Sequence, residues 1–156
     1  MISSLVVPTQ HLLAQQHDDI NEFLDAWHLA AENADEETFF GSMSPSCVYI
    51  GTDASERWTR DELKEWSIKY FQRESAWAFT PRERNLMISE DGNTAWFSEL
   101  LETWMGICRG SGVLQKNKTG MWQLEQYHLG VTVNNDLIKE FIELVKQDSI
   151  NDYLKK

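Results

Sequence analysis

The period of the hydrophobic pattern changes after Pro81, and this change limits the folds open to the chain. Apolar and polar residues alternate over four later segments, 82–90, 93–104, 107–117 and 121–133. The short turn-forming sequences EDGN, MG and KTG separate these segments. Alternation with a period of two is typical of β-strands, and tight turns join antiparallel neighbours. The pattern therefore predicts a four-stranded antiparallel meander.

Helical spacing dominates the chain before this point. An amphipathic pattern runs from Thr9 to about Asn33, with apolar residues on one face and acidic residues opposite. A short second helix is expected in NADEETFFGSMSP, where an Asn or Asp cap precedes acidic residues and Gly41 and Pro45 follow. The strand SCVYIGT comes next.

A third helix is predicted over residues 59–73. Thr59 is its expected cap, because Glu62 stands at the capping-box position. The apolar stripe of this helix includes Trp66 and Tyr70. We expect these two side chains to serve in packing alone, against a sheet or another helix.

A last helix completes the fold prediction. It lies in NDLIKEFIELVKQ, capped by Asn135 or Asp136, and the final residues of the chain are expected to fray. Helices followed by a curled meander predict an α+β protein in which the antiparallel sheet wraps around the N-terminal helices. The 156 residues suit one domain, 1–156, because no linker divides them.

The charge of the chain excludes two classes of partner. Acidic residues outnumber basic ones 25 to 14, and the formal net charge is −11. Nucleic-acid binding relies on Lys and Arg that neutralise phosphates, so no nucleic-acid partner is expected. The same charge disfavours an anionic membrane surface, and no window reaches the roughly 18 apolar residues of a membrane span.

No metal site or cofactor is predicted. Cys47 and Cys108 lack a CxxC or other metal-binding spacing, and we expect both to be small core residues. His17, Asp18 and Asp19 are better explained as a solvated helix face than as metal ligands. GxGxxG, P-loop and GxSxG motifs are missing from the sequence. The N-terminus lacks the basic and apolar segments of a signal peptide, which predicts a cytoplasmic protein.

The two faces of the predicted sheet carry different side chains. If each hairpin loop has an even number of residues, one face combines three Trp with ionisable groups, and Arg109 lies beside His128. A turn at Met105-Gly106 would place Glu102 opposite Arg109. Ionisable groups among apolar ones are costly to bury unless paired or wet, so this face is predicted to line a cavity. We call this set the mixed face: Trp96, Ser98, Leu100, Glu102, Trp104, Arg109, Ser111, Val113, Trp122, Leu124, Gln126 and His128.

Two alternatives to this cavity stay open. Either Arg109, Glu102 and His128 form a satisfied structural network, or a bulge shifts the register and turns some of them to solvent. The other face pairs Arg84 with Glu99 and is otherwise largely apolar. We expect a homodimer to bury a patch on that face, because so large an apolar area is rarely left in water. The patch consists of Phe97, Leu101, Tyr127 and Leu129.

The loop GTDASERWTRDE is a second candidate region, between the first strand and the third helix. Asp53, Glu56, Arg57 and Trp58 lie where a loop can fold over the mouth of a cavity. The alternative is that Trp58 is a hydrophobic staple for the third helix, while Asp53 and Glu56 are solvated.

The layout, together with AWHLAAENADEETFFGSMSPSCVYIGTD, AWFSELLE, CRGSGVL and GMWQLEQYHLG, resembles the SnoaL-like members of the nuclear transport factor 2-like superfamily. The resemblance covers roughly residues 18–145. Its most specific part is an Arg-containing strand, a hairpin, then Gly-x-Trp followed by a hydrophobic residue and a His. Arg109, Gly120, Trp122, Leu124 and His128 match this pattern. The resemblance implies a cone-shaped α+β barrel with a cavity between sheet and helices, and usually a dimer formed through the sheet.

The resemblance leaves the activity open, because the superfamily contains ketosteroid isomerase, polyketide cyclases, dehydratases and non-catalytic binding or assembly domains. The isomerase pattern needs a carboxylate base with a Tyr and a protonated Asp as hydrogen-bond donors. Trp27 and His28 stand in the first helix where such a Tyr is expected, which counts against a steroid isomerase.

We therefore expect a homodimer that binds a small, partly apolar molecule, in some cases an anion, in its cavity. Arg109 would hold a carboxylate or enolate, and His128 would supply a hydrogen bond. If the chain is an enzyme, His128 shuttles a proton and Arg109 stabilises an oxyanion, without a cofactor. The third class is a structural or partner-binding module. The expected ligand-binding residues are Asp53, Trp58, Trp96, Glu99, Glu102, Trp104 and Gln126.

Overall fold

The structure is a computed structural model that describes residues 9–146, with side chains from residue 14 onward. The predicted order of helices and strands is confirmed within these residues, and the expected fraying of the last residues lies outside them. A short strand within the candidate loop was not predicted. The elements are α1 (Thr9–Glu32), α2 (Glu36–Gly41), β1 (Met43–Ile50), β2 (Arg57–Thr59), α3 (Arg60–Phe71), β3 (Thr80–Ile88), β4 (Thr94–Thr103), β5 (Gly106–Lys116), β6 (Trp122–Val131), the 3-10 turn Asn135–Leu137 and α4 (Ile138–Lys146).

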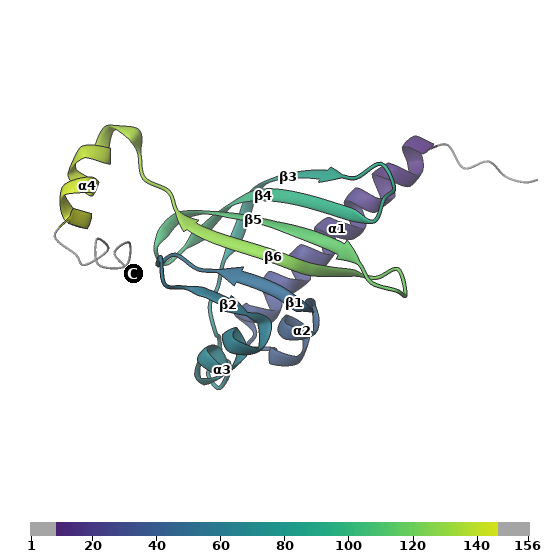
Figure 1. The fold of residues 1–156 in the computed structure, drawn as a ribbon, viewed down its shortest axis with the longest axis horizontal. Helices are drawn as coiled ribbons and strands as arrows, with labels where there is room; N and C mark the ends of the chain where they lie inside the picture. Colours follow the sequence, from purple (N-terminus) through teal and green to yellow (C-terminus); the bar gives the residue numbers. More distant parts are fainter. Residues whose placement is uncertain (1–8, 147–156) are drawn as a thin grey trace, which may run out of the picture.

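The strands form one curved, unclosed sheet in the order β2-β1-β6-β5-β4-β3 (Figure 1). Strands β3 to β6 are the predicted antiparallel meander. Strand β1 adds to this meander by pairing in parallel with β6, and β2 pairs with β1 in the antiparallel sense. The α+β fold, with a curved sheet around N-terminal helices, is confirmed.

Helix α1 covers the inner face of the sheet, and its apolar stripe accounts for this position (Figure 1). Ile20, Leu24, Trp27 and Ala31 recur at helical spacing and are all at most 2% exposed. Residues three or four positions apart lie on one side of a helix, so all four side chains enter the same core. Their sheet partners in the core include Ala95, Phe97, Leu101, Cys108, Leu114, Leu124, Tyr127 and Leu129.

The two short helices begin at caps that the sequence predicts. The Asp35 side chain accepts a hydrogen bond from the Thr38 backbone N–H at the start of α2. Thr59 and Glu62 form the complete capping box at the start of α3. These caps satisfy backbone groups that the first turn of a helix leaves free. Helix α3 contacts β1 and β2, at one edge of the sheet.

Strand β6 contains a bulge that reverses the direction of its side chains. Val113 pairs with Gln126, but the next residue of β5, Leu114, pairs with Leu124, so Glu125 is an extra residue. An extra residue exchanges the two faces of a strand with a side-chain period of two. Leu124 is consequently fully buried, whereas Gln126 is exposed.

The bulge is held by hydrogen bonds to β1. The Glu125 carboxylate accepts hydrogen bonds from the Ser44 and Ser46 hydroxyl groups, at 2.8 and 3.1 Å. Strand β1 is itself irregular between Met43 and Val48, the stretch that contains these serines. The two irregular segments therefore stabilise each other across the strand pair.

Helix α4 stands apart from the rest of the fold (Figure 1). Its side chains are not buried, and Ile138, Phe141 and Ile142 are 42–43% exposed along one stripe. The Asn134 side chain, rather than the predicted Asn135 or Asp136, caps the 3-10 turn that leads into this helix. None of the described helices is long and apolar enough to cross a membrane.

Candidate functional site

The mixed face lies on the outside of the sheet, so the prediction that this face as a whole lines the cavity is wrong; of its residues, only Trp104, at the turn between β4 and β5, lines the cavity described below. Glu102, Arg109, Gln126 and His128 are exposed, and Trp96 is 47% exposed. The helices cover the opposite face, which carries more apolar side chains and therefore excludes more water when buried. Leu124 belongs to that inner face because of the β6 bulge.

The pairing of Arg109 also differs from the expectation. Arg109 lies opposite Leu100, because the hairpin turn is Trp104-Met105 rather than Met105-Gly106. Glu102 instead forms an ion pair with Arg82 of β3 at the surface. Arg109 and His128 share a face, as predicted, but that face meets solvent.

The patch expected to form the dimer contact is part of the core. The expected set was assigned to the wrong side of the sheet, because alternation identifies residues that share a face but not which face is inside. Its members are each at most 4% exposed: Phe97, Leu101, Tyr127 and Leu129.

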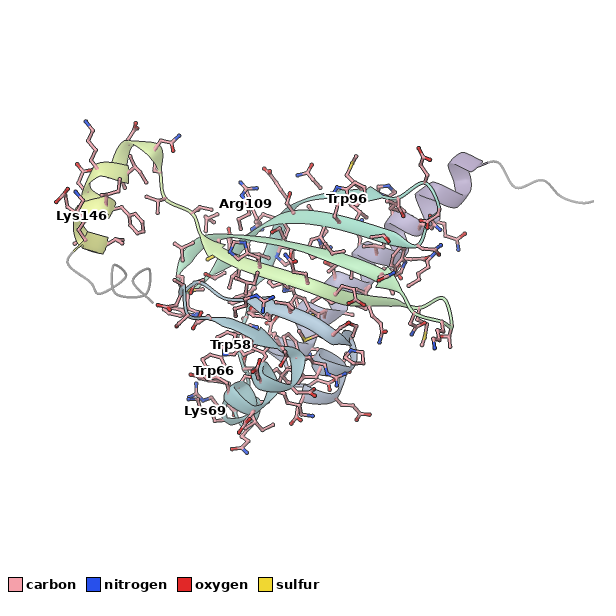
Figure 2. All side chains as sticks on the ribbon, in the orientation of Figure 1. Trp58, Trp66, Lys69, Trp96, Arg109 and Lys146 are labelled. Atoms are coloured by element: carbon pink, nitrogen blue, oxygen red, sulfur yellow. The ribbon has the colours of Figure 1, made fainter. Side chains whose placement is uncertain are left out.

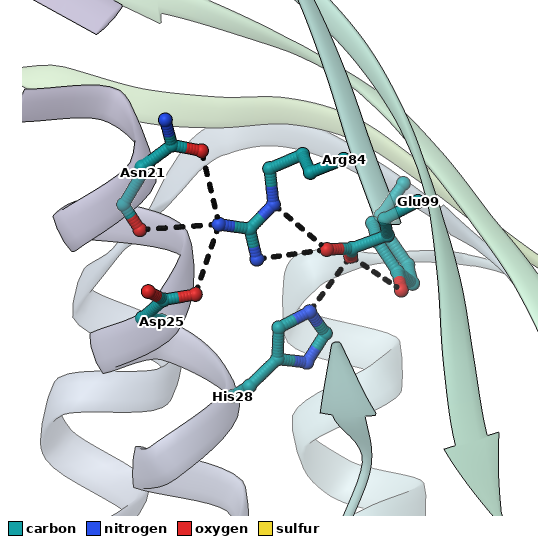
Figure 3. Close-up of polar contacts among 6 residues, drawn as sticks. Asn21, Asp25, His28, Arg84 and Glu99 are labelled. Atoms are coloured by element: carbon teal, nitrogen blue, oxygen red, sulfur yellow. Dashed lines mark hydrogen bonds and ion pairs between the residues drawn. The ribbon is translucent and has the colours of Figure 1, made fainter. Parts of the chain in front are cut away.

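The inner face holds one group of charged side chains, centred on Glu99 (Figure 3). The predicted ion pair with Arg84 is confirmed, with Glu99 Oε2 at 2.9 Å from Nε and 2.8 Å from Nη2. The other carboxylate oxygen accepts hydrogen bonds from His28 Nε2 at 2.7 Å and from the Tyr127 hydroxyl at 3.4 Å. Arg84 also reaches Asp25 of α1, at 2.9 Å. These contacts tie α1 to β3 and β4.

The electrostatics of this group are those of a satisfied network. Burial alone would raise the pKa of Glu99, but the hydrogen bond from His28 and the charge of Arg84 lower it below its usual value. Burial raises the pKa of Tyr127 well above its usual value, and the Glu99 charge adds to this effect. Glu99 is therefore an anion with full partners, which suits a structural role better than the expected ligand contact.

A cavity of about 430 Å³ lies elsewhere, between α3, the β1–β2 hairpin and the β4–β5 turn. It takes in residues from five separate segments of the chain. The lining residues are Tyr49, Gly51, Thr52, Glu56, Trp58, Leu63, Trp66, Tyr70, Arg73, Ala76, Trp77, Phe79, Trp104, Met105 and Leu129. Two of the expected ligand-binding residues, Trp58 and Trp104, are among them.

Aromatic rings dominate this cavity. Four of the seven tryptophans in the chain line it. Trp58 of β2 stacks on Trp66 of α3, with ring centroids 4.9 Å apart, and this pair lies far from Trp96 and Arg109 (Figure 2). Trp66 is 42% exposed and Trp104 is 83% exposed, so rings at the mouth of the cavity remain open to solvent.

The assignment of Trp66 and Tyr70 to packing alone is wrong. Both line the cavity, and the more deeply buried residues of the α3 stripe are Leu63 and Phe71. The stripe of α3 is wider than its buried part, because Leu63 and Phe71 are buried while Trp66 of the same stripe is 42% exposed. Part of the stripe is thus left to face a cavity.

The polar groups of the cavity are few. Glu56 and Arg73 are its ionisable lining residues apart from the tyrosines. The Arg73 guanidinium lies 4.7 Å from the centre of the Tyr70 ring, and Lys69 lies 5.0 Å from the same ring. Asp53 stays outside the lining, and its backbone N–H donates to Glu56. Among the side chains that the structure describes, no His, Cys, Asp and Glu residues cluster as metal ligands.

Sequence reasoning missed several cavity residues because no periodic pattern marks them. Trp77 and Phe79 belong to the segment between α3 and β3, where neither helical spacing nor alternation applies. The sequence predicts that Tyr49 belongs to a strand, but the alternating stretch of β1 is too short to indicate which face of the sheet its side chain joins. The cluster of aromatic residues in SAWAF was the available signal.

Comparison with known proteins agrees with this fold. The SnoaL-like domain family matches residues 20–134 of the chain. A proposed dehydratase of the NTF2-like family from Streptomyces avermitilis has a similar structure, with a TM-score of 0.66 and 13% identity over 78% of this chain and 99% of that one. The chain has no significant match among curated proteins.

Two further solved structures extend the comparison. An NTF2-like protein of unknown function from Pseudomonas putida KT2440 has a TM-score of 0.63 and 12% identity, over 79% of this chain and 90% of that one. A proposed ketosteroid isomerase from Parabacteroides distasonis ATCC 8503 has a TM-score of 0.57 and 15% identity, over 72% and 85%. At such identities the structures establish the fold and not the activity. Because the family match covers most of its length, the chain belongs to the SnoaL-like family of the nuclear transport factor 2-like superfamily.

Proposed function

We propose that the protein binds a small, partly apolar molecule in the aromatic cavity between α3 and the β1–β2 hairpin. The concentration of aromatic rings around this cavity carries the proposal. Large rings left open to water are costly unless something covers them, and flat apolar molecules gain most from stacking on them. A volume of about 430 Å³ lies within the range of small-molecule sites.

A cofactor-free isomerase, dehydratase or cyclase reaction is the second candidate for the same cavity. Glu56 favours it, because a carboxylate in the lining is the group that proton transfer next to a carbonyl requires. Arg109 and His128 have no part in this candidate, since both lie on the outer face. Turnover of a bound compound, abolished in Glu56→Gln while binding persists, would separate this reaction from binding alone.

The proposal also includes a homodimer through the sheet, now by its outer face. Met87, Trp96 and Val113 lie side by side on β3, β4 and β5. Met87 is 58% exposed and Trp96 is 47% exposed, so this row is an apolar area that a second copy could cover. A cytoplasmic location is retained as part of the proposal, because both buried cysteines are free thiols.

Nuclear magnetic resonance of the tryptophan indole N–H groups tests the cavity. The four cavity tryptophans should shift on titration with 2-naphthol, while Trp27 and Trp96 should not. Trp66→Ala should weaken binding by about tenfold, as loss of a stacked ring does. Trp96→Ala is the matched control, since it removes a half-exposed ring from the outer face and should leave binding unchanged. Uniform small shifts of all tryptophans would contradict the proposal.

A further inference from the structure

The β1–β2 hairpin presents four residues to the cavity on one face. Tyr49 pairs with Trp58, and the Gly51 backbone N–H donates to the Glu56 carbonyl at 2.8 Å, which continues the same register. Residues two positions apart on a strand share a face. Tyr49, Gly51, Glu56 and Trp58 accordingly all line the cavity.

The missing side chain of Gly51 makes room for the Glu56 carboxylate. Glu56 Oε2 occupies the place that a Cβ atom on Gly51 would take. This oxygen accepts a hydrogen bond from the Asp53 backbone N–H at 3.1 Å, which fixes the carboxylate over the hairpin. Its second oxygen, Oε1, accepts no hydrogen bond from the residues that the structure describes. Because Glu56 lines the cavity, this oxygen is free to accept a hydrogen bond from a ligand there.

The Tyr49 hydroxyl is the second unpaired polar group of this face. Tyr49 is only 7% exposed, and its hydroxyl has no hydrogen-bond partner among the described residues. The hydroxyl keeps some solvent-accessible surface, because Trp27 Nε1 is the one described side-chain nitrogen or oxygen that is both fully buried and without a partner, and Tyr49 lines the cavity. Burial raises the pKa of Tyr49, and the Glu56 charge raises it further. Tyr49 is thus a neutral hydrogen-bond donor at physiological pH.

We propose that Tyr49 and Glu56 together select a neutral ligand that presents a hydrogen-bond acceptor beside a donor, such as a carboxamide or a lactam, and disfavour carboxylates. This inference rests on the proposed function of the cavity. Tyr49 donates to the acceptor of the ligand, and Glu56 accepts from its donor. A carboxylate offers acceptors alone, so one of its oxygens would face the Glu56 carboxylate without a hydrogen bond.

The basic residues of the site do not reverse this preference. Arg73 and Lys69 lie against the Tyr70 ring on α3, on the helix side of the cavity, whereas Tyr49 and Glu56 belong to the hairpin. The net charge of −11 further disfavours anions near the protein. The expectation of an anionic ligand depended on Arg109, which lies on the outer face.

Two nearly isosteric probes, 2-naphthamide and 2-naphthoate, test the inference. Titration into the protein, followed at the cavity tryptophans, should give at least about tenfold tighter binding of the amide, as expected for one charge-assisted hydrogen bond gained or lost. Glu56→Gln should reduce this preference by about tenfold, because a glutamine amide can donate to a carboxylate. Tyr49→Phe should weaken both probes several-fold, since both offer an acceptor to the hydroxyl.

The control variant is Glu65→Gln, which makes the same chemical change on an exposed position of α3 outside the lining. It should leave the ratio of the two affinities as in the wild type. Equal affinities for both probes, or a ratio that ignores Glu56→Gln, would overturn the inference. Unchanged binding in Tyr49→Phe would overturn it as well. If 2-naphthol and both probes leave the cavity tryptophans unmoved, the proposed function itself fails.

Discussion

Arg82 and Arg84 lie two residues apart on β3, and each forms an ion pair with a glutamate of β4. Their surroundings differ. The Arg84 side chain is 9% exposed and that of Glu99 is fully buried, whereas the side chains of Arg82 and Glu102 are at least half exposed. The same chemical pair therefore has a different energetic role at each position.

Substitution of each arginine by methionine should reveal this difference. Arg84→Met leaves the Glu99 carboxylate buried without its arginine partner, with His28 and the Tyr127 hydroxyl as its remaining hydrogen-bond partners, so the free energy of unfolding should fall by about 3 kcal/mol. Arg82→Met, the matched control, should leave the midpoint of urea denaturation where it is. Equal losses in the two variants would mean that burial of the Arg84 pair does not determine its contribution.

The alternation of residue types along the strands explains why the fold could be predicted from the sequence, while the position of the cavity could not. Alternation correctly grouped Arg109 with His128 and Arg84 with Glu99, because side-chain direction follows from the strand period. It could not say which group faces inward, since both faces mix apolar and charged residues. Tertiary packing determines which face is buried. The glutamate on that face, Glu99, is stabilised there by its ion pair with Arg84.

At the scale of elements, α2 and α4 carry comparable phenylalanines with opposite surroundings. Phe39 of α2 is 1% exposed and stacks on Trp27, with ring centroids 4.9 Å apart. Phe141 of α4 is 42% exposed, on a helix without buried residues. Helix α2 is therefore part of the core, and α4 buries no side chain against it.

Alanine substitutions should separate these two helices. Phe39→Ala should lower the free energy of unfolding by about 3 to 5 kcal/mol, as large-to-small core changes do. Phe141→Ala should change it by less than about 0.5 kcal/mol, as surface substitutions do. Chemical denaturation of both variants measures the contrast. A large loss in Phe141→Ala would mean that α4 packs against another surface in solution.

Cap and turn chemistry made most element boundaries predictable, although the β4–β5 turn and the last cap each lie one residue earlier than expected, whereas the cavity depended on segments without a period. The Thr59–Glu62 capping box and the glycines with positive φ at the hairpins, Gly106 and Gly120, are local signals. Trp77 and Trp104 reach the cavity from a loop and a turn. Their meeting results from long-range packing, which local patterns do not encode.

At the scale of the whole molecule, the outer face of the sheet determines how copies can associate. Sedimentation velocity should find a dimer at micromolar concentration if the row of Met87, Trp96 and Val113 is the contact. Trp96→Glu should convert it to a monomer, because a carboxylate in an apolar interface is costly. Trp104→Glu alters a more exposed tryptophan at the cavity and should preserve the dimer. A monomeric wild type would contradict this association.

The extra residue in β6 also fixes how long the chain must be at that point. Residues 126–131 keep Tyr127 and Leu129 inside only because Glu125 is inserted between them and Leu124. Without Glu125, the rest of the strand would turn over, so His128 would enter the core and Tyr127 would leave Glu99. Insertions and deletions are therefore far less acceptable here than substitutions, and related chains should vary in length at the turns instead.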